Sequence, residues 1–262
     1  MDEHLLDDLA LNNGLRETDC RLKLLLGLGA ILICVFSPSP VTPIIIGISM
    51  LLIIVGLANI PLRIMAGLLL IPVAFAATSC VVILILTGGG EPLYTLSVFG
   101  FSFTATTESA NLSLLLLART FGAMSALFFI ALSTPMIQVF SVMNDLRLPR
   151  EFIDLSMLIY RLIFIFIGEA IAIHNAQVMR HGYSGFRKSV HALSMLCGAL
   201  FIKAWERGEE MLIAMDSRCY DGKFEKVADE HPVSLQSAAA VGSYLVGCSI
   251  LSLLLSGVVL WP

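Results

Sequence analysis

The sequence predicts an all-α integral membrane protein with about five transmembrane helices and a platform of amphipathic and long helices at the cytoplasmic face. Hydrophobic residues make up 57% of the chain and charged residues 14%, whereas soluble domains usually have about 45–50% and about 25%. Several apolar runs approach the length that a helix needs to cross about 30 Å of hydrocarbon. Basic residues concentrate in one part of the chain: eleven of the sixteen Lys and Arg residues lie between Arg147 and Lys226. Six transmembrane helices are the alternative to five.

Net charge and cysteine spacing argue against two classes of function. A formal net charge of −4 does not suit a nucleic-acid partner, which needs a basic surface. The six cysteines stand singly without a C-x-x-C pair, so neither a zinc site nor a redox pair is predicted. The first twenty residues are acidic and lack an apolar run, so we expect no cleaved signal peptide and a cytoplasmic N-terminus.

Residues 1–134 are predicted to form a cytoplasmic lead-in and four transmembrane helices. Four apolar runs give these helices: 24–36, 44–60, 64–86 and 109–133. Arg21 and Lys23 precede the first run and mark its start as cytoplasmic, because Lys and Arg concentrate on that side of a membrane. Residues 87–108 lack Lys and Arg and are predicted to be external, with a small β-hairpin among them.

Arg119 lies well inside the fourth apolar run, where a charge costs about 2.5–3.5 kcal/mol on insertion scales. The side chain must therefore be paired or solvated by neighbouring helices. One hypothesis is a substrate or proton path, and the other is a buried structural pair with Glu169. We favour the pair, because a proton relay needs several ionisable groups in sequence and the first four runs offer almost none.

Residues 135–235 are predicted to form a cytoplasmic coupling region. Thr134-Pro135 is a helix-start signal, and the short amphipathic helix that follows should lie along the interface. Two long helices are expected next, and residues 236–262 provide the last transmembrane helix. If the first long helix, 151–174, crossed the membrane fully, basic residues at 180, 187 and 188 would face outward. We therefore expect both long helices to lie on the cytoplasmic boundary or to slant through it.

Two arginines end the long helical patterns. Arg180 stands in Met179-Arg180-His181, and Arg218 stands in Ser217-Arg218-Cys219. An arginine presents a planar fork of donors that suits a carboxylate in a partner's groove. A cation at a helix C-terminus also complements the negative end of the helix dipole. Partner docking and capping of the arginine's own helix are therefore both open.

The chain resembles the transmembrane (T) components of energy-coupling factor transporters, most closely the cobalt-type CbiQ family. The resemblance covers nearly the whole chain and rests on the order and spacing of short segments: Thr18-Asp-Cys-Arg-Leu-Lys-Leu24, Gly89-Gly-Glu-Pro-Leu93, Gly100-Phe-Ser-Phe-Thr104, Ser133-Thr-Pro135, Leu146-Arg-Leu-Pro149, Tyr160-Arg161, Ala176-Gln177 with Arg180, and Glu206-Arg-Gly-Glu-Glu210 through Tyr220-Asp-Gly222. In this family each coupling motif reads roughly Ala-Arg-Gly. Arg180 and Arg218 match this motif, while the residues that flank them differ from it.

The resemblance implies a non-catalytic scaffold subunit, in the cell (inner) membrane, of an ATP-driven importer for cobalt or nickel, with a link to cobalamin biosynthesis. It implies that the two arginine motifs bind two cytoplasmic ABC-type ATPases, which hydrolyse the ATP. It further implies a separate substrate-binding membrane subunit of cobalt type that carries the metal, and it allows a small accessory membrane subunit. We expect neither a cofactor nor a metal site in this chain itself.

Two other transport functions stay open. One is a T component that serves a vitamin-type substrate subunit. The other is a self-contained secondary metal transporter or channel, which would need ionisable groups or broken helices near the membrane midplane. A membrane enzyme finds no support, because the sequence has no G-x-S-x-G, H-E-x-x-H or Walker motif.

The charge distribution makes a testable prediction of topology, with residues 135–235 cytoplasmic and residues 87–108 external. In a background with the native cysteines replaced, we expect Lys188→Cys to be protected from a membrane-impermeant thiol reagent in intact cells and to react once the cells are opened. A cysteine placed within 87–108 should react in intact cells. Labelling of Lys188→Cys from outside would refute the topology with five helices.

Overall fold

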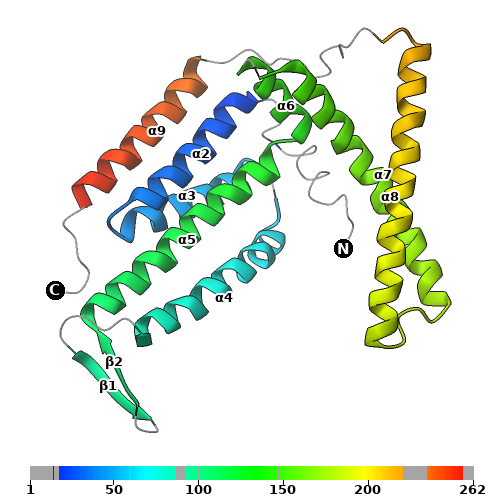
Figure 1. Ribbon diagram of the computed structural model, residues 1–262. Coiled ribbons are helices and arrows are strands. Elements are labelled where there is room, and N and C mark those ends of the chain that lie inside the picture. The colour runs from blue at the N-terminus through cyan, green and yellow to red at the C-terminus, as the bar shows by residue number, and fades with distance from the viewer. Residues whose placement is uncertain are drawn as a thin grey trace. The chain divides into compact units, whose positions relative to one another are not determined.

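The computed structural model describes Gly14 and residues 18–58, 60–86, 92–98, 101–146, 148–220 and 235–255. The chain divides into two compact units, one made of residues 1–139 and 229–262 and the other of residues 140–228. Helices form both units, apart from one two-stranded hairpin among the described residues (Figure 1). The predicted class, an all-α membrane protein, is confirmed.

Among the described residues, the first unit contains the hairpin and five complete helices: α2 (Cys20–Phe36), α3 (Val41–Gly56), α4 (Leu62–Leu86), β1 (Pro92–Val98), β2 (Phe101–Thr106), α5 (Thr107–Ser133) and α9 (Leu235–Leu254). In this unit α5 packs against α2, α3 and α4, and α9 packs against α2 and α3 (Figure 1). The predicted hairpin is confirmed, because β1 and β2 pair antiparallel with Val98 opposite Phe101. Its external position stays a prediction.

Local sequence signals fix both ends of α5. The Thr106 hydroxyl accepts from the Ser109 backbone N–H at 3.3 Å, and the Ser109 hydroxyl accepts from the Thr106 N–H at 3.0 Å. This reciprocal arrangement satisfies two donors that a helix start leaves unpaired. At the other end α5 stops at Ser133, and α6 (Met136–Asp145) begins directly after Pro135. The helix start predicted from Thr134-Pro135 is confirmed.

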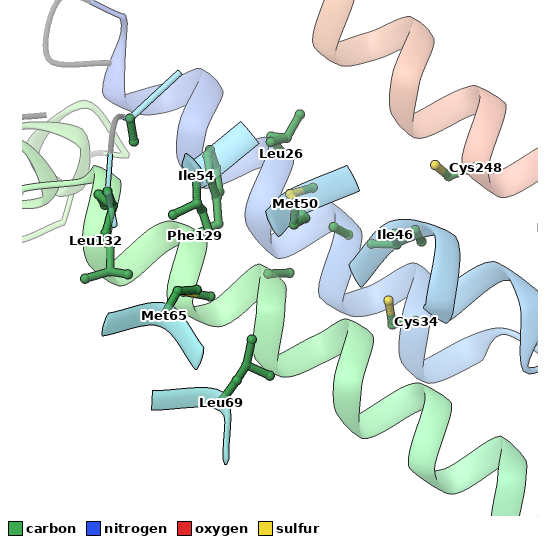
Figure 2. Close-up of a cluster of buried hydrophobic side chains, with 14 residues drawn as sticks. Leu26, Cys34, Ile46, Met50, Ile54, Met65, Leu69, Phe129, Leu132 and Cys248 are labelled. Atoms are coloured by element: carbon green, nitrogen blue, oxygen red, sulfur yellow. The ribbon is translucent and has the colours of Figure 1, made fainter. Parts of the chain in front are cut away.

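Small residues let the helices of the first unit approach closely around α5. A Cβ added to Gly122 would lie 2.5 Å from the carbonyl oxygen of Pro43 and 2.8 Å from the sulfur of Cys34. Larger apolar side chains fill the space on either side, as Figure 2 shows for residues from α2, α3, α4 and α5: Leu26, Ile46, Met50, Ile54, Met65, Leu69, Phe129 and Leu132. Close packing of this kind replaces the hydrophobic effect as the main attraction between helices in a lipid environment.

Two basic side chains cap the C-terminal ends of α2 and α5 reciprocally. The Lys23 ammonium of α2 donates to the carbonyl oxygen of Ser133, the last residue of α5, at 3.2 Å. The Arg119 guanidinium of α5 donates twice, at 2.7 and 3.2 Å, to the carbonyl oxygen of Ser37, the C-cap of α2. Each cation thus complements the negative end of the neighbouring helix dipole and satisfies a carbonyl that lacks an intrahelical donor.

The predicted pair between Arg119 and Glu169 would join residues of different units and stays a prediction, although each side chain has another partner. Arg119 is occupied by the Ser37 carbonyl, and Glu169 instead accepts from Lys203. Ser37 is buried, so its carbonyl oxygen needs a donor within the protein, and the Arg119 guanidinium supplies it. The prediction that Arg119 has a structural partner holds, but its partner is backbone.

The second unit is a helical hairpin formed by α7 (Arg150–Met179) and α8 (Phe186–Ser217), with the later part of α6 beside α7. The ring of Phe140 from α6 meets the edge of Tyr160 in α7 at 6.0 Å. The two long helices run antiparallel and contact each other, and Figure 1 shows them crossing. Both helices were predicted, with α7 extending a few residues beyond the predicted 151–174.

Within the described ranges, four helices are long and apolar enough to cross a membrane: α4, α5, α7 and α9. The protein is therefore a multi-pass membrane protein. This set differs from the predicted one in two ways. α2 and α3, with 17 and 16 residues, fall short of the roughly 20 residues that a span usually needs. α7 qualifies by length and composition although we predicted it at the boundary. The labelling of residue 188 decides between these placements of α7.

The reciprocal caps predict the effect of removing Arg119. Arg119→Met leaves the Ser37 carbonyl without its charged donor, so we expect the free energy of unfolding in detergent to fall by about 1.5–3 kcal/mol. Arg119→Lys should cost less, because it keeps the charge but not the forked donors. Arg63→Met, at an exposed arginine of α4, is the matched control and should leave stability nearly unchanged. Lost transport at unchanged stability would instead support a substrate or proton path through Arg119.

Candidate partner-docking site

Arg180 and Arg218 occupy equivalent positions at the ends of α7 and α8. Each is the C-cap of its helix, following Met179 and Ser217, the last helical residues. Each is followed by a residue with left-handed backbone, since φ is 56° at His181 and 54° at Cys219. All six residues of the two predicted motifs are exposed. The structure thus gives both motifs one local geometry.

Backbone hydrogen bonds close both helix ends in the same pattern. At the end of α7, the Gly182 N–H donates to the Gln177 carbonyl at 2.9 Å and the His181 N–H donates to the Val178 carbonyl at 3.0 Å. At the end of α8, the corresponding bonds run from Tyr220 to Met215 at 3.1 Å and from Cys219 to Asp216 at 3.0 Å. This pair of bonds is the Schellman motif, which satisfies the last carbonyls without a side chain.

The arginine side chains are therefore not needed as caps. Neither Arg180 nor Arg218 has a side-chain hydrogen bond or ion pair with any residue that the structure describes. An exposed guanidinium with five free N–H donors can bind a carboxylate with two parallel hydrogen bonds. The geometry thus favours partner docking over capping as the use of these side chains, although both cations still lie at the negative ends of their helix dipoles.

The left-handed residues explain why the family motif has glycine after arginine. Glycine adopts positive φ without strain, whereas other L-residues pay roughly 1–2 kcal/mol there. Among the non-glycine residues that the structure describes, His181 and Cys219 alone have positive φ. Both departures from the family motif therefore keep the backbone path that glycine would take, and the arginine before each keeps its position.

Side chains of α7 and of the turn after it brace the first motif. The Gln177 side chain donates to the Ala192 carbonyl of α8 at 3.0 Å and accepts from the Tyr183 hydroxyl at 2.8 Å. The Tyr183 ring also lies 4.7 Å from the ring of His174. A side chain at Gly182 would press against the Gln177 carbonyl at 3.0 Å, so this glycine lets the turn close tightly. Arg180 is thus held at a compact corner between α7 and α8.

The two arginines lie near opposite ends of α8. Arg180 stands just before the start of α8, and Arg218 stands directly after its last residue. α8 has 32 residues, which corresponds to about 48 Å. Two points so far apart are better suited to two partner molecules, or to two copies of one partner, than to one small groove.

Several residues of this region were not singled out for a role in the sequence analysis. Gln177 was noted as part of a motif, but its contacts with Tyr183 and Ala192 depend on the turn geometry. No sequence pattern indicated the ion pair of Lys203, because its partner Glu169 lies 34 positions away in the chain. No group of three or more His, Cys, Asp or Glu residues within the described ranges could hold a metal ion.

The strained residues give a prediction that is independent of any partner. His181→Gly and Cys219→Gly should each raise the free energy of unfolding by up to about 1 kcal/mol, because glycine removes the left-handed strain at the C′ position. Cys219→Val, with a β-branched side chain at the same φ, should lower it. Thermal unfolding of the purified chain in detergent measures both. A loss of stability with glycine would show that the left-handed geometry is not present in solution.

Comparisons with known proteins identify the family of the chain. The model of the CbiQ family, described as cobalt transport protein, matches residues 12–228 and so includes both arginine motifs. A protein of Methanocorpusculum labreanum, named as a fused cobalt transport protein CbiMQ, is 48% identical over 241 residues, which cover 92% of this chain and 40% of the relative. The chain thus spans less than half the length of that relative.

Two further relatives are similar over most of both chains. An uncharacterized protein of Methanocaldococcus jannaschii is 36% identical over 225 residues, 86% of this chain and 84% of the relative. The cobalt transport protein CbiQ of Rhodobacter capsulatus is 26% identical over 218 residues, 83% of this chain and 85% of the relative. The family match and these relatives together show that the chain belongs to the CbiQ family.

Proposed function

We propose that this chain is the transmembrane scaffold subunit of an ATP-driven importer for cobalt, with nickel as the alternative metal. It would couple ATP hydrolysis by partner ABC-type ATPases to movement of a separate substrate-binding membrane subunit. The observation that carries the proposal is the pair of exposed arginines, which cap nothing because backbone bonds already close both helices. The cobalt specificity rests on the names of the family and of two relatives.

The ATPase contact is proposed at Arg180 and Arg218 together with their flanking residues Met179, His181, Ser217 and Cys219. One ATPase would bind near each end of α8, because about 48 Å separates the two ends. Each arginine would enter a groove and pair with a carboxylate there. The chain itself would be non-catalytic, with ATP hydrolysis in the partners.

A membrane partner is proposed for the apolar surface of the second unit. Among their described residues, α7 buries Ile153 and α8 buries Ala192, and most other apolar side chains of these helices are exposed. Apolar patches of this extent mark a contact with lipid or with another protein. The name of the fused relative joins a CbiM part to a CbiQ part. We propose that a CbiM-like substrate-binding subunit covers part of this surface.

The coupling proposal predicts the effect of removing each arginine. Arg180→Ala or Arg218→Ala should remove a charge-assisted contact whose loss costs about 2–5 kcal/mol when the partner carboxylate stays buried. The double variant should lose far more ATPase than either single variant, because two contacts on one scaffold support each other through effective concentration. Arg→Lys should rescue only partly, since it keeps the charge without the forked donors.

Co-purification of the ATPases at matched membrane expression measures this prediction. If the arginines only complemented their own helix dipoles, each alanine variant would cost at most about 1 kcal/mol of helix stability and assembly would persist. Undiminished recovery of ATPases with the double variant would overturn docking through these residues. Metal uptake by the purified chain without any ATPase would favour a self-contained transporter instead.

A further inference from the structure

One ion pair joins α7 to α8 away from their connecting turn. The Lys203 ammonium of α8 donates to a carboxylate oxygen of Glu169 in α7. Both side chains are about half exposed, at 45% and 42%. A half-exposed ion pair contributes little to folding stability. Its position matters more than its strength.

This ion pair is the second of two polar contacts, here called ties, that join α7 to α8. The first tie is the hydrogen bond from the Gln177 side chain to the Ala192 carbonyl, close to the turn. Glu169 lies eight positions before Gln177, which is about 12 Å along α7, and Lys203 lies eleven positions after Ala192, about 16 Å along α8. A side chain on a helix leans toward the N-terminus, so the long Lys203 side chain can reach back across the difference.

Two polar contacts at different places along a pair of helices restrict the angle at which the helices cross. The tie at Gln177 acts as the pivot, because Tyr183 and Gly182 pack the turn around it. The tie at Lys203 then decides how far the rest of α8 swings from α7. Beyond Lys203, α8 continues for 14 residues to Ser217, about 21 Å, and ends at Arg218. A small change of angle at the ion pair therefore moves Arg218 by a large distance relative to α7.

We propose that Glu169 and Lys203 are positioning residues that set the crossing angle of α7 and α8 and so the place of Arg218 relative to Arg180. This inference rests on the proposed function for its role in coupling, but the angle itself does not. A tie that is half exposed can open and close again, which suits a scaffold that must follow its ATPases. Removing either charge should free the far part of α8 while leaving both helix ends intact.

The angle is measured on the full chain alone in lipid nanodiscs. Nitroxide labels at Leu155→Cys in α7 and Ile213→Cys in α8, both exposed positions, report the distance between the far parts of the helices. We expect Glu169→Gln and Lys203→Met to broaden the distribution of distances, and the charge swap Glu169→Lys with Lys203→Glu to restore it. Glu210→Gln is the matched control, because it removes the ion pair of Glu210 with Arg207 inside α8 and should change nothing.

Coupling is measured in the assembled complex with the same variants. With α8 misplaced, simultaneous docking of both arginines is weakened, so recovery of ATPases should drop by up to about fivefold with each single variant and return with the charge swap. An unchanged distance distribution in Glu169→Gln and Lys203→Met overturns the proposal. A broadened distribution with undiminished ATPase recovery overturns the positioning role. Failure of docking through the arginines would appear separately, as full ATPase recovery with the double alanine variant.

Discussion

The first unit depends on the two basic side chains that α2 and α5 exchange at their C-terminal ends. Ser37 and Ser133 are buried in the protein, so water does not reach these helix ends and their carbonyls must find donors within the protein. Lys23 and Arg119 supply these donors from opposite ends of the same antiparallel contact. The distance from Lys23 to Ser37 along α2 equals that from Arg119 to Ser133 along α5, so both bonds fit one register.

Arginine is used in opposite ways in the two units. In the first unit Arg119 closes a helix that cannot close itself, and its guanidinium is thereby occupied. In the second unit the helix ends close through their own backbone, and the guanidinium groups of Arg180 and Arg218 are left for a partner. This main-chain closure requires a strained, left-handed residue after each arginine. Strain of this kind is typical of sites that bind other molecules.

Sequence patterns predicted those parts of the structure that depend on neighbours along the chain. Apolar runs located the helices of both units, and Thr134-Pro135 located the start of α6. Interactions with main-chain atoms or with residues far away in the sequence were not predicted. The Arg119 partner is the carbonyl of Ser37, which no residue type reveals, and Glu169 meets Lys203 only because the turn at 180–185 folds α8 back along α7. Left-handed backbone at His181 and Cys219 was also missed, because propensity assigns that conformation to glycine.

The closure of α7 and α8 by main-chain atoms has a consequence for how such proteins diverge. The two hydrogen bonds that close each helix end join main-chain atoms, so they place no chemical requirement on the residue that follows the arginine beyond tolerance of its φ. Histidine and cysteine already stand there in one chain. Sequence profiles that demand glycine at this site would overlook relatives whose geometry is the same. The arginine and the helix before it are the better signature.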